Sequence, residues 1–162
     1  MKISFSLSSK SVLEAKNKIK EYQKTYTKTL NDIIKQTADD SVKYAKKQLL
    51  KYNAYYSGRT YNSIYVLYTN KRKFRIHFGG ASPYVEFGTG IIGQQHPHPE
   101  AEKRGIVYDV NKHGLKGWIY YDDVAHKTRW TMGMESRPFI MKTRDYMKRR
   151  YAYLLKKRLG GK

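Results

Sequence analysis

The sequence predicts an α+β fold, built as a single domain over residues 1–162. Hydrophobic residues recur every three or four positions near both ends of the chain, as in amphipathic helices, and alternate with polar residues in the middle, as in strands. The order helix, strands, helix has no internal repeat and no βαβ unit, which is typical of α+β proteins. With 162 residues and 40% hydrophobic content, the chain is long enough for one core.

The first helix is expected over residues 11–51, where Ser11 and Glu14 have the spacing of a capping box. One face carries its apolar and aromatic residues: Val12, Ala15, Ile19, Tyr22, Tyr26, Leu30, Ile34, Ala38, Val42, Ala45 and Leu49. An unbroken helix of this range would be roughly 60 Å long, more than a domain of this size needs. It therefore either breaks near residues 25–29 or projects toward a neighbour, and we expect its apolar face to pack on the sheet of its own chain.

The middle of the chain predicts a small, mostly antiparallel sheet between residues 64 and 121. Its expected segments are a hairpin of residues 64–69 and 74–78, a short strand or turn at 84–87, and a strand at 117–121. Residues 90–116 are rich in Gly, Pro, His and charge, which predicts a long excursion loop with a short strand at 106–110. We expect this loop to be extended or poorly ordered in the free subunit and to become ordered against a neighbour.

A second helix is expected over residues 138–159, with Pro138 in its first turn and glycines after its end. Both helices should pack on the sheet. We expect the core side of this helix to carry Met147, Tyr151, Leu154 and Leu155. Its basic residues should then face solvent or acidic partners.

Glycines at positions 88, 90 and 93 match the dinucleotide-binding pattern formally. That pattern needs a helix opening at its last glycine, and Pro97 and Pro99 follow too closely to permit one. We therefore expect no nucleotide cofactor. Gly88 and Gly90 are better explained as positions with positive φ or close backbone approach.

Three further side chains near these glycines suit catalysis or metal binding by type. Glu86, between apolar neighbours, could act as a general acid, but no base or orienting group accompanies it, and such a residue more commonly lies on an edge strand or pairs with Arg. His96 and His98 would project together from an extended segment, yet a metal site needs three or four ligands. We expect solvated loop histidines, no metal, no cofactor and no enzymatic activity.

The charge balance of the chain favours acidic partners. There are 33 Lys and Arg against 13 Asp and Glu, a net charge of +20, which suits nucleic acid, anionic surfaces or acidic proteins. The absence of cysteine excludes disulfides and thiolate metal sites. Neither an apolar leader nor a run of roughly 18 apolar residues is present, so we expect an unprocessed chain with no membrane contact.

Three blocks of residues carry a resemblance to a known family. They are SGRTYNSI at residues 57–64, YVEFGTG at 84–90 and GMESRPF at 133–139, the last leading into the C-terminal helix. Together they resemble the neck and tail-completion (head-tail joining) proteins of long-tailed double-stranded DNA phages. The first block differs from the family's usual Thr-Gly-Arg-Leu form at Ser57 and Tyr61.

The resemblance implies a small, non-enzymatic α+β subunit that forms a homo-oligomeric ring in the virion neck after assembly in the host cytoplasm. Its expected partners are head-closure and tail proteins, with passing double-stranded DNA as a further contact. We expect a structural and assembly corner from Tyr84, Glu86, Phe87, Gly88, Gly90, Pro138 and Phe139, and partner docking by Lys156, Lys157 and Arg158. The alternatives left open are a free basic nucleic-acid-binding protein and a hydrolase that uses Glu86 with a loop histidine.

Overall fold

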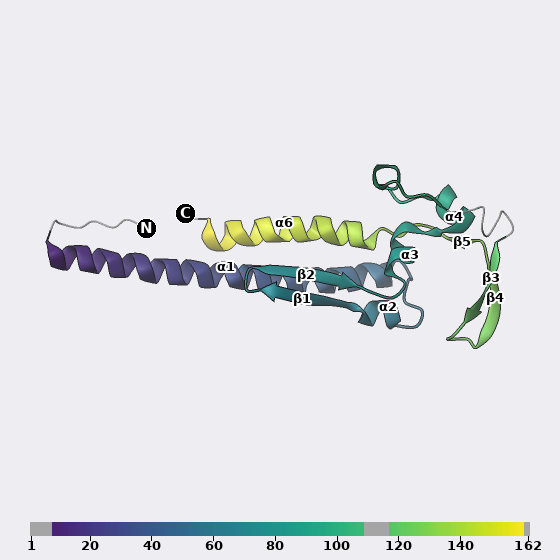
Figure 1. The fold of residues 1–162 in the computed structure, drawn as a ribbon, viewed down its shortest axis with the longest axis horizontal. Coiled ribbons are helices and arrows are strands. Elements are labelled where there is room, and N and C mark those ends of the chain that lie inside the picture. The colour runs from purple at the N-terminus through teal and green to yellow at the C-terminus, as the bar shows by residue number, and fades with distance from the viewer. Residues whose placement is uncertain (1–7, 109–116, 161–162) are drawn as a thin grey trace.

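The computed structural model describes residues 8–108 and 117–160, and it has the predicted α+β fold. A long N-terminal helix and a C-terminal helix run side by side, and two small antiparallel hairpins complete the molecule (Figure 1). The helices are α1 (Ser9–Lys51), α2 (Arg59–Asn62), α3 (Ser82–Phe87), α4 (Gly90–Gln95), the 3-10 turn η1 (Glu102–Arg104) and α6 (Phe139–Leu159). The strands are β1 (Ile64–Asn70), β2 (Lys73–Phe78), β3 (Trp118–Asp122), β4 (Lys127–Thr131) and β5 (Gly133–Met134).

Helix α1 is continuous over 43 residues, so of the two alternatives the break near residues 25–29 does not occur. The predicted capping box is wrong. The cap is Ser8, whose hydroxyl accepts a hydrogen bond from the backbone N–H of Ser11 at 3.3 Å, and Ser11 lies inside the first turn. The first part of α1 extends well beyond the end of α6 (Figure 1).

Helix α6 packs antiparallel along the second half of α1. The rings of Tyr44 and Tyr146 stack with centroids 4.2 Å apart, and Arg150 pairs with Asp40 at 2.8 Å. The buried apolar residues of this region are Ile33, Ala38, Ala45 and Leu49 on α1, Phe139 and Leu154 on α6, and Ile64 and Val85 nearby. The two helices therefore form most of the core with each other, and the sheet contributes less than the sequence predicted.

Of the α6 residues expected to face the core, Leu154 is buried and Met147 and Leu155 are half-buried. Tyr151 is exposed, so that prediction is wrong. The physical reason is that α1 is the main neighbour of α6, and one flanking helix covers only a narrow stripe.

The predicted hairpin is confirmed: β1 pairs antiparallel with β2, with Val66 opposite Ile76. The single sheet over residues 64–121 is wrong, because β3 pairs with β4 in a separate two-stranded sheet. The sequence reasoning missed β4, whose residues are mostly polar. The β1–β2 hairpin lies along α1, whereas the β3–β4 hairpin lies at the far end of the molecule (Figure 1).

Residues 82–87 and 90–95 are helical, where a short strand or turn and a loop were expected. Pro83 falls in the first turn of α3, where its missing N–H costs nothing, and Gly88 ends the helix. α4 and η1 occupy part of the predicted excursion loop, so its described part is not extended. Residues 106–108 form no strand, and the rest of the strand expected at 106–110 lies outside the described residues.

Candidate functional site

Glu86, on α3, caps the N-terminus of α6. Its buried carboxylate accepts hydrogen bonds from the backbone N–H groups of Ile140 at 2.6 Å and Met141 at 2.9 Å. The first N–H groups of a helix have no partner within it and form the positive end of its dipole, so a carboxylate satisfies both needs. Pro138, which directly precedes α6, provides no side-chain cap. Glu86 thus supplies from 54 residues away the cap that the local sequence lacks.

The other partner of Glu86 is His98, which is also buried. Its Nε2 lies 3.0 Å from Glu86 Oε1, and its Nδ1 lies 3.0 Å from the backbone nitrogen of Glu100. Because the Glu100 N–H donates, Nδ1 must accept, so the hydrogen-bond network assigns the ring proton to Nε2, which donates to Glu86. Both nitrogens of a neutral imidazole are therefore used, and Phe87 packs against the ring at a centroid distance of 4.9 Å.

Gly88 and Gly90 join this corner to the segment before α6. Both have positive φ, 77° and 61°, as the sequence predicted. A Cβ on Gly88 would lie 2.7 Å from the carbonyl oxygen of Met134, and one on Gly90 would lie 2.7 Å from the ring of Trp118. Ser136 completes the junction, since its hydroxyl donates to the carbonyl oxygen of Glu86 at 2.7 Å. The second and third sequence blocks therefore interlock through close backbone contacts.

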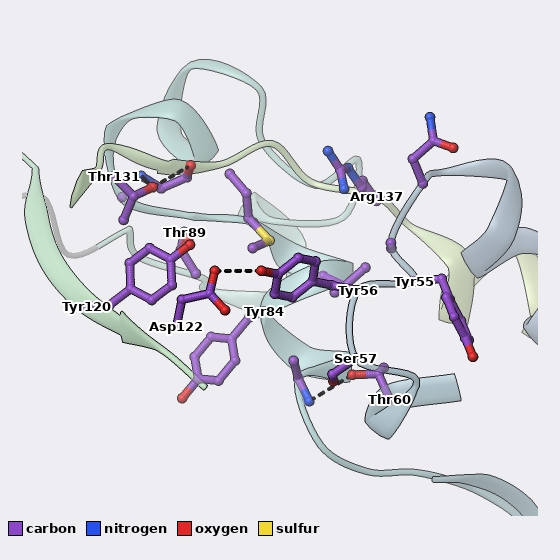
Figure 2. A pocket seen from close by; sticks show the side chains of 18 of the residues that line it. Tyr55, Tyr56, Ser57, Thr60, Tyr84, Thr89, Tyr120, Asp122, Thr131 and Arg137 are labelled. Atoms are coloured by element: carbon purple, nitrogen blue, oxygen red, sulfur yellow. Dashed lines mark hydrogen bonds between the residues drawn. The ribbon is translucent and has the colours of Figure 1, made fainter. Parts of the chain in front are cut away.

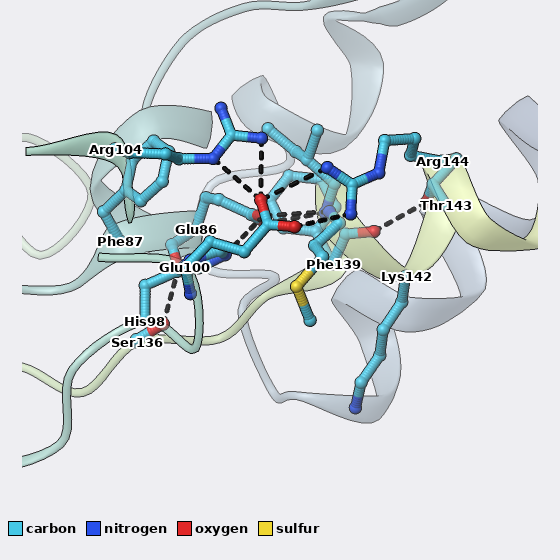
Figure 3. Close-up of polar contacts among 12 residues, drawn as sticks. Glu86, Phe87, His98, Glu100, Arg104, Ser136, Phe139, Lys142, Thr143 and Arg144 are labelled. Atoms are coloured by element: carbon cyan, nitrogen blue, oxygen red, sulfur yellow. Dashed lines mark hydrogen bonds and ion pairs between the residues drawn. The ribbon is translucent and has the colours of Figure 1, made fainter. Parts of the chain in front are cut away.

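Glu100 links the described part of the excursion loop to α6 (Figure 3). Its two oxygens bind both terminal nitrogens of Arg144, at 2.7 and 3.2 Å, and one of them accepts from Arg104 at 2.8 Å. Hydrogen bonds from Arg144 and then Arg104 lower the pKa of Glu100 to about 2, and the same contact raises the pKa of Arg144. This partly exposed cluster anchors residues 98–104 beside the Glu86 cap.

The structure places the predicted corner residues in two groups. Glu86, Phe87, Gly88, Gly90 and Phe139 come together, with Phe139 buried in the core and Pro138 at the helix entry. Tyr84 is 62% exposed and points into a neighbouring cleft instead.

Two expectations about side chains at this corner are wrong. Glu86 is a buried residue of α3, and it bonds to backbone N–H groups and His98, not to an arginine or to solvent. His98 is buried while His96 is exposed, so the expectation of solvated loop histidines is wrong for His98. The backbone N–H of His98 also donates to the hydroxyl of Tyr108, which helps to hold this segment in place.

A cleft of about 940 Å³ lies between the loop before α2, α3 and the β3–β4 hairpin (Figure 2). Its lining includes seven aromatic residues. The aromatic residues that line it are Tyr55, Tyr56, Tyr61, Tyr84, Tyr108, Trp118 and Tyr120. Surfaces of this kind suit contacts with apolar or planar groups of a partner. The sequence signal for these aromatic side chains is the tyrosine-rich stretch at residues 52–61.

Asp122 closes one side of the cleft. One of its oxygens accepts from the hydroxyl of Tyr56 and contacts Arg129, each at 2.6 Å, and the other accepts from the backbone N–H groups of Val124 and Ala125. The Tyr56 hydrogen bond lowers the pKa of Asp122 and raises the pKa of Tyr56. Asp122 is the carboxylate among the described lining residues, and its lone pairs are already engaged.

The carboxylates of Glu86 and Asp122 both accept hydrogen bonds from other groups of the protein. Among residues 8–108 and 117–160, no group of three or more His, Cys, Asp or Glu side chains is placed to hold a metal ion. None of the helices in these two ranges has the length and hydrophobicity to span a bilayer.

The three predicted docking residues lie at the free end of α6. Lys156 and Lys157 are exposed, and the Lys157 ammonium lies 5.8 Å from the ring centroid of Tyr153. Arg158 is also exposed but donates a hydrogen bond to Gln36 of α1. Part of this basic cluster therefore ties the two helices together within the subunit.

Comparisons with protein-family models, with curated proteins and with solved structures found no match for this chain.

Proposed function

We propose that this chain is a structural subunit of the neck of a long-tailed double-stranded DNA phage, where it joins the DNA-filled head to the tail as a ring of identical subunits. The observation that carries the proposal is the way the three family-like blocks are used. The second and third blocks form the interlocked corner, and Thr60 of the first block accepts a hydrogen bond from the backbone N–H of Ala81 at the start of α3. Every block therefore serves architecture, as expected for an assembly protein.

The surface of the subunit supports an assembly role. Large apolar residues are exposed on the first half of α1 and on the β3–β4 hairpin, at opposite ends of the long molecule (Figure 1). Examples are Ile19 at 45% and Ile119 at 68% exposure. Apolar surfaces at two ends of one subunit suit contacts with different neighbours, which is what a ring between two other rings requires.

The net charge of +20 is compatible with a neck ring if most of the Lys and Arg side chains face away from the channel through which DNA passes. A dense belt of Lys and Arg repeated in every subunit would bind passing phosphates and slow DNA exit. Lys156 and Lys157 should instead meet carboxylates of adjacent ring proteins. Replacing both by Glu should impair head-to-tail joining and leave the subunit folded. If the double variant joined heads to tails normally, Lys156 and Lys157 would not be docking residues.

Imaging intact virions at a resolution that traces the chain tests the proposal directly. We expect ring density that fits α1, α6 and the corner at the junction of head and tail. Particles that contain the chain elsewhere, or infectious particles assembled without it, would contradict the proposal.

A basic nucleic-acid-binding protein is the second candidate, and one observation favours it. Tyr153 is exposed and lies between Arg150 and Lys157, with cation to ring-centroid distances of 5.4 and 5.8 Å. Exposed aromatic rings flanked by cations can stack on bases while the cations contact phosphates. Binding to DNA that falls steeply with added salt, and that Tyr153→Ala weakens, would support this function.

A further inference from the structure

The first half of α1 carries an apolar seam whose larger side chains are exposed. We define the seam as Val12, Ala15, Ile19, Tyr22 and Tyr26, whose spacing alternates between three and four residues. This is the heptad spacing of coiled coils. Val12, Ile19, Tyr22 and Tyr26 are each 41–51% exposed, whereas the small side chain of Ala15 is 8% exposed.

The seam continues the face of α1 that α6 covers. The same heptad series continues through Thr29 to Ile33, which is fully buried. Asp40 and Tyr44, which contact α6, project in nearly the same direction as the seam at about 100° per residue. On this helical face, Ile33 is therefore covered, whereas the large side chains from Val12 to Tyr26 are exposed.

We propose that a second copy of this chain covers the seam, with the two α1 helices paired antiparallel as a short coiled coil. The proposal concerns the free subunit and does not depend on the neck function. The continuity with the α1–α6 contact is the reason to expect a helix as the occupant, because the same surface already accepts one.

The direction of pairing follows from the position of α6. In a parallel pair, the α1 of the second copy would continue past Ile33 into the space that α6 occupies, since α1 is unbroken to Lys51. In an antiparallel pair, it continues beyond Ser9, where α6 does not reach (Figure 1). Steric exclusion therefore selects the antiparallel arrangement.

The antiparallel copy would also begin where α6 ends. Extrapolated from the Asp40–Arg150 pair, the end of α6 lies level with about residue 31 of α1. With Ile19 opposite Tyr22 of the second copy, Ser9 of that copy lies level with about residue 32. The positive N-terminal end of its α1 would then face the negative C-terminal end of α6.

The positions that flank the seam place no like charges together in this register. Antiparallel coiled coils oppose e with e and g with g positions. Lys16 would face Gln23, Lys18 would face Thr25, and Asp32 would face Ser11. The remaining repulsion is between the net charges of +20 on each chain, which salt screens. Self-association should therefore strengthen as salt rises, opposite to DNA binding.

Sedimentation of the full-length chain tests the pairing. We expect a dimer at physiological salt, and we expect Ile19→Lys to weaken self-association by more than about tenfold because it places a charge in the seam. Leu13→Lys is the matched control: it adds the same charge to an exposed apolar residue of the same helix, off the seam, and should leave the dimer intact. Circular dichroism should show both variants folded.

Disulfide trapping tests the direction, because the chain has no cysteine of its own. Ile19→Cys and Tyr22→Cys proteins, mixed and oxidised, should form the mixed disulfide in preference to either symmetric one. Predominant symmetric disulfides would indicate parallel pairing and contradict the proposal. A wild-type protein that is monomeric at every salt concentration would also overturn the proposal. So would a Leu13→Lys variant whose self-association is weakened as much as that of Ile19→Lys. Both outcomes are independent of what virion imaging shows.

Discussion

The corner around Glu86 and the first half of α1 reverse the usual placement of side chains. At the corner, a carboxylate and an imidazole are buried and fully hydrogen-bonded. Along the first half of α1, Ile19 and Tyr22 are exposed although Ile33, in the same heptad series, is fully buried. Residue type determines whether a side chain is stabilised by apolar packing or by hydrogen bonds. The neighbouring elements determine whether those contacts form within the subunit.

Adding a methyl group to Gly88 should have the largest effect on folding. Gly88→Ala combines the cost of a positive φ with a Cβ placed 2.7 Å from the Met134 carbonyl oxygen and 2.8 Å from the Ser136 nitrogen. We expect a loss of at least about 3 kcal/mol in the free energy of unfolding, measured by urea denaturation. Gly105→Ala is the matched control, since Gly105 also has positive φ but no atom within 4 Å. Equal losses for the two variants would mean that the interlock does not constrain the fold.

Removing the carboxylate of Glu86 should have the next largest effect. Glu86→Ala leaves two N–H groups of α6 and the Nε2–H of His98 without acceptors, so we expect a loss of about 2–3 kcal/mol. Glu86→Gln keeps one acceptor oxygen and should lose less. Glu102→Ala, at an exposed acid, should be neutral. A stable Glu86→Ala protein that lost a catalytic activity would instead reveal a chemical role for this carboxylate.

The contact between Glu100 and Arg144 should give a smaller, pH-dependent effect. The folded-state pKa of Glu100 is lowered from 4.5 to about 2, so the stabilisation is present above about pH 4.5 and is lost as pH falls toward 2. Arg144→Gln should therefore destabilise the protein at neutral pH, and its difference from wild type should shrink through this range. Arg149→Gln, at an exposed position of the same helix, should show no such trend. If the difference in stability between Arg144→Gln and wild type stayed constant with pH, the ion pair would not be its cause.

Shortening the exposed isoleucine of α1 should have the smallest effect on the isolated subunit. Ile19→Ala should change the free energy of unfolding of the monomer by less than about 0.5 kcal/mol, since little surface is buried there. Ile33→Ala, at the covered position of the same series, should cost about 2–5 kcal/mol. Dilute protein should be used, so that self-association does not contribute. Similar losses at the two sites would show that the first half of α1 is covered in the monomer.

The corner around Glu86 was only partly predictable from the sequence. The positive φ of Gly88 and Gly90 was predicted, because Pro97 and Pro99 argue against the helix that a dinucleotide-binding motif needs after Gly93. The role of Glu86 was missed, since its acceptor groups come from residues 140 and 141 and the need for a cap arises only after α6 meets α3. His98 was predicted as solvated because a His between prolines carries no local signal of burial.

The sequence by itself determined the two long helices, the first hairpin and the α+β class, because these depend on periodicities of 3.6 and 2 residues within short windows. Only the tertiary structure decided three other features. It split the strands into two separate hairpins, turned residues 82–87 into a helix, and left half of the α1 face uncovered. The physical reason is the same for all three, because each depends on where segments distant in the sequence begin and end. An apolar stripe predicts that a face is buried, but it does not identify the element that packs against it.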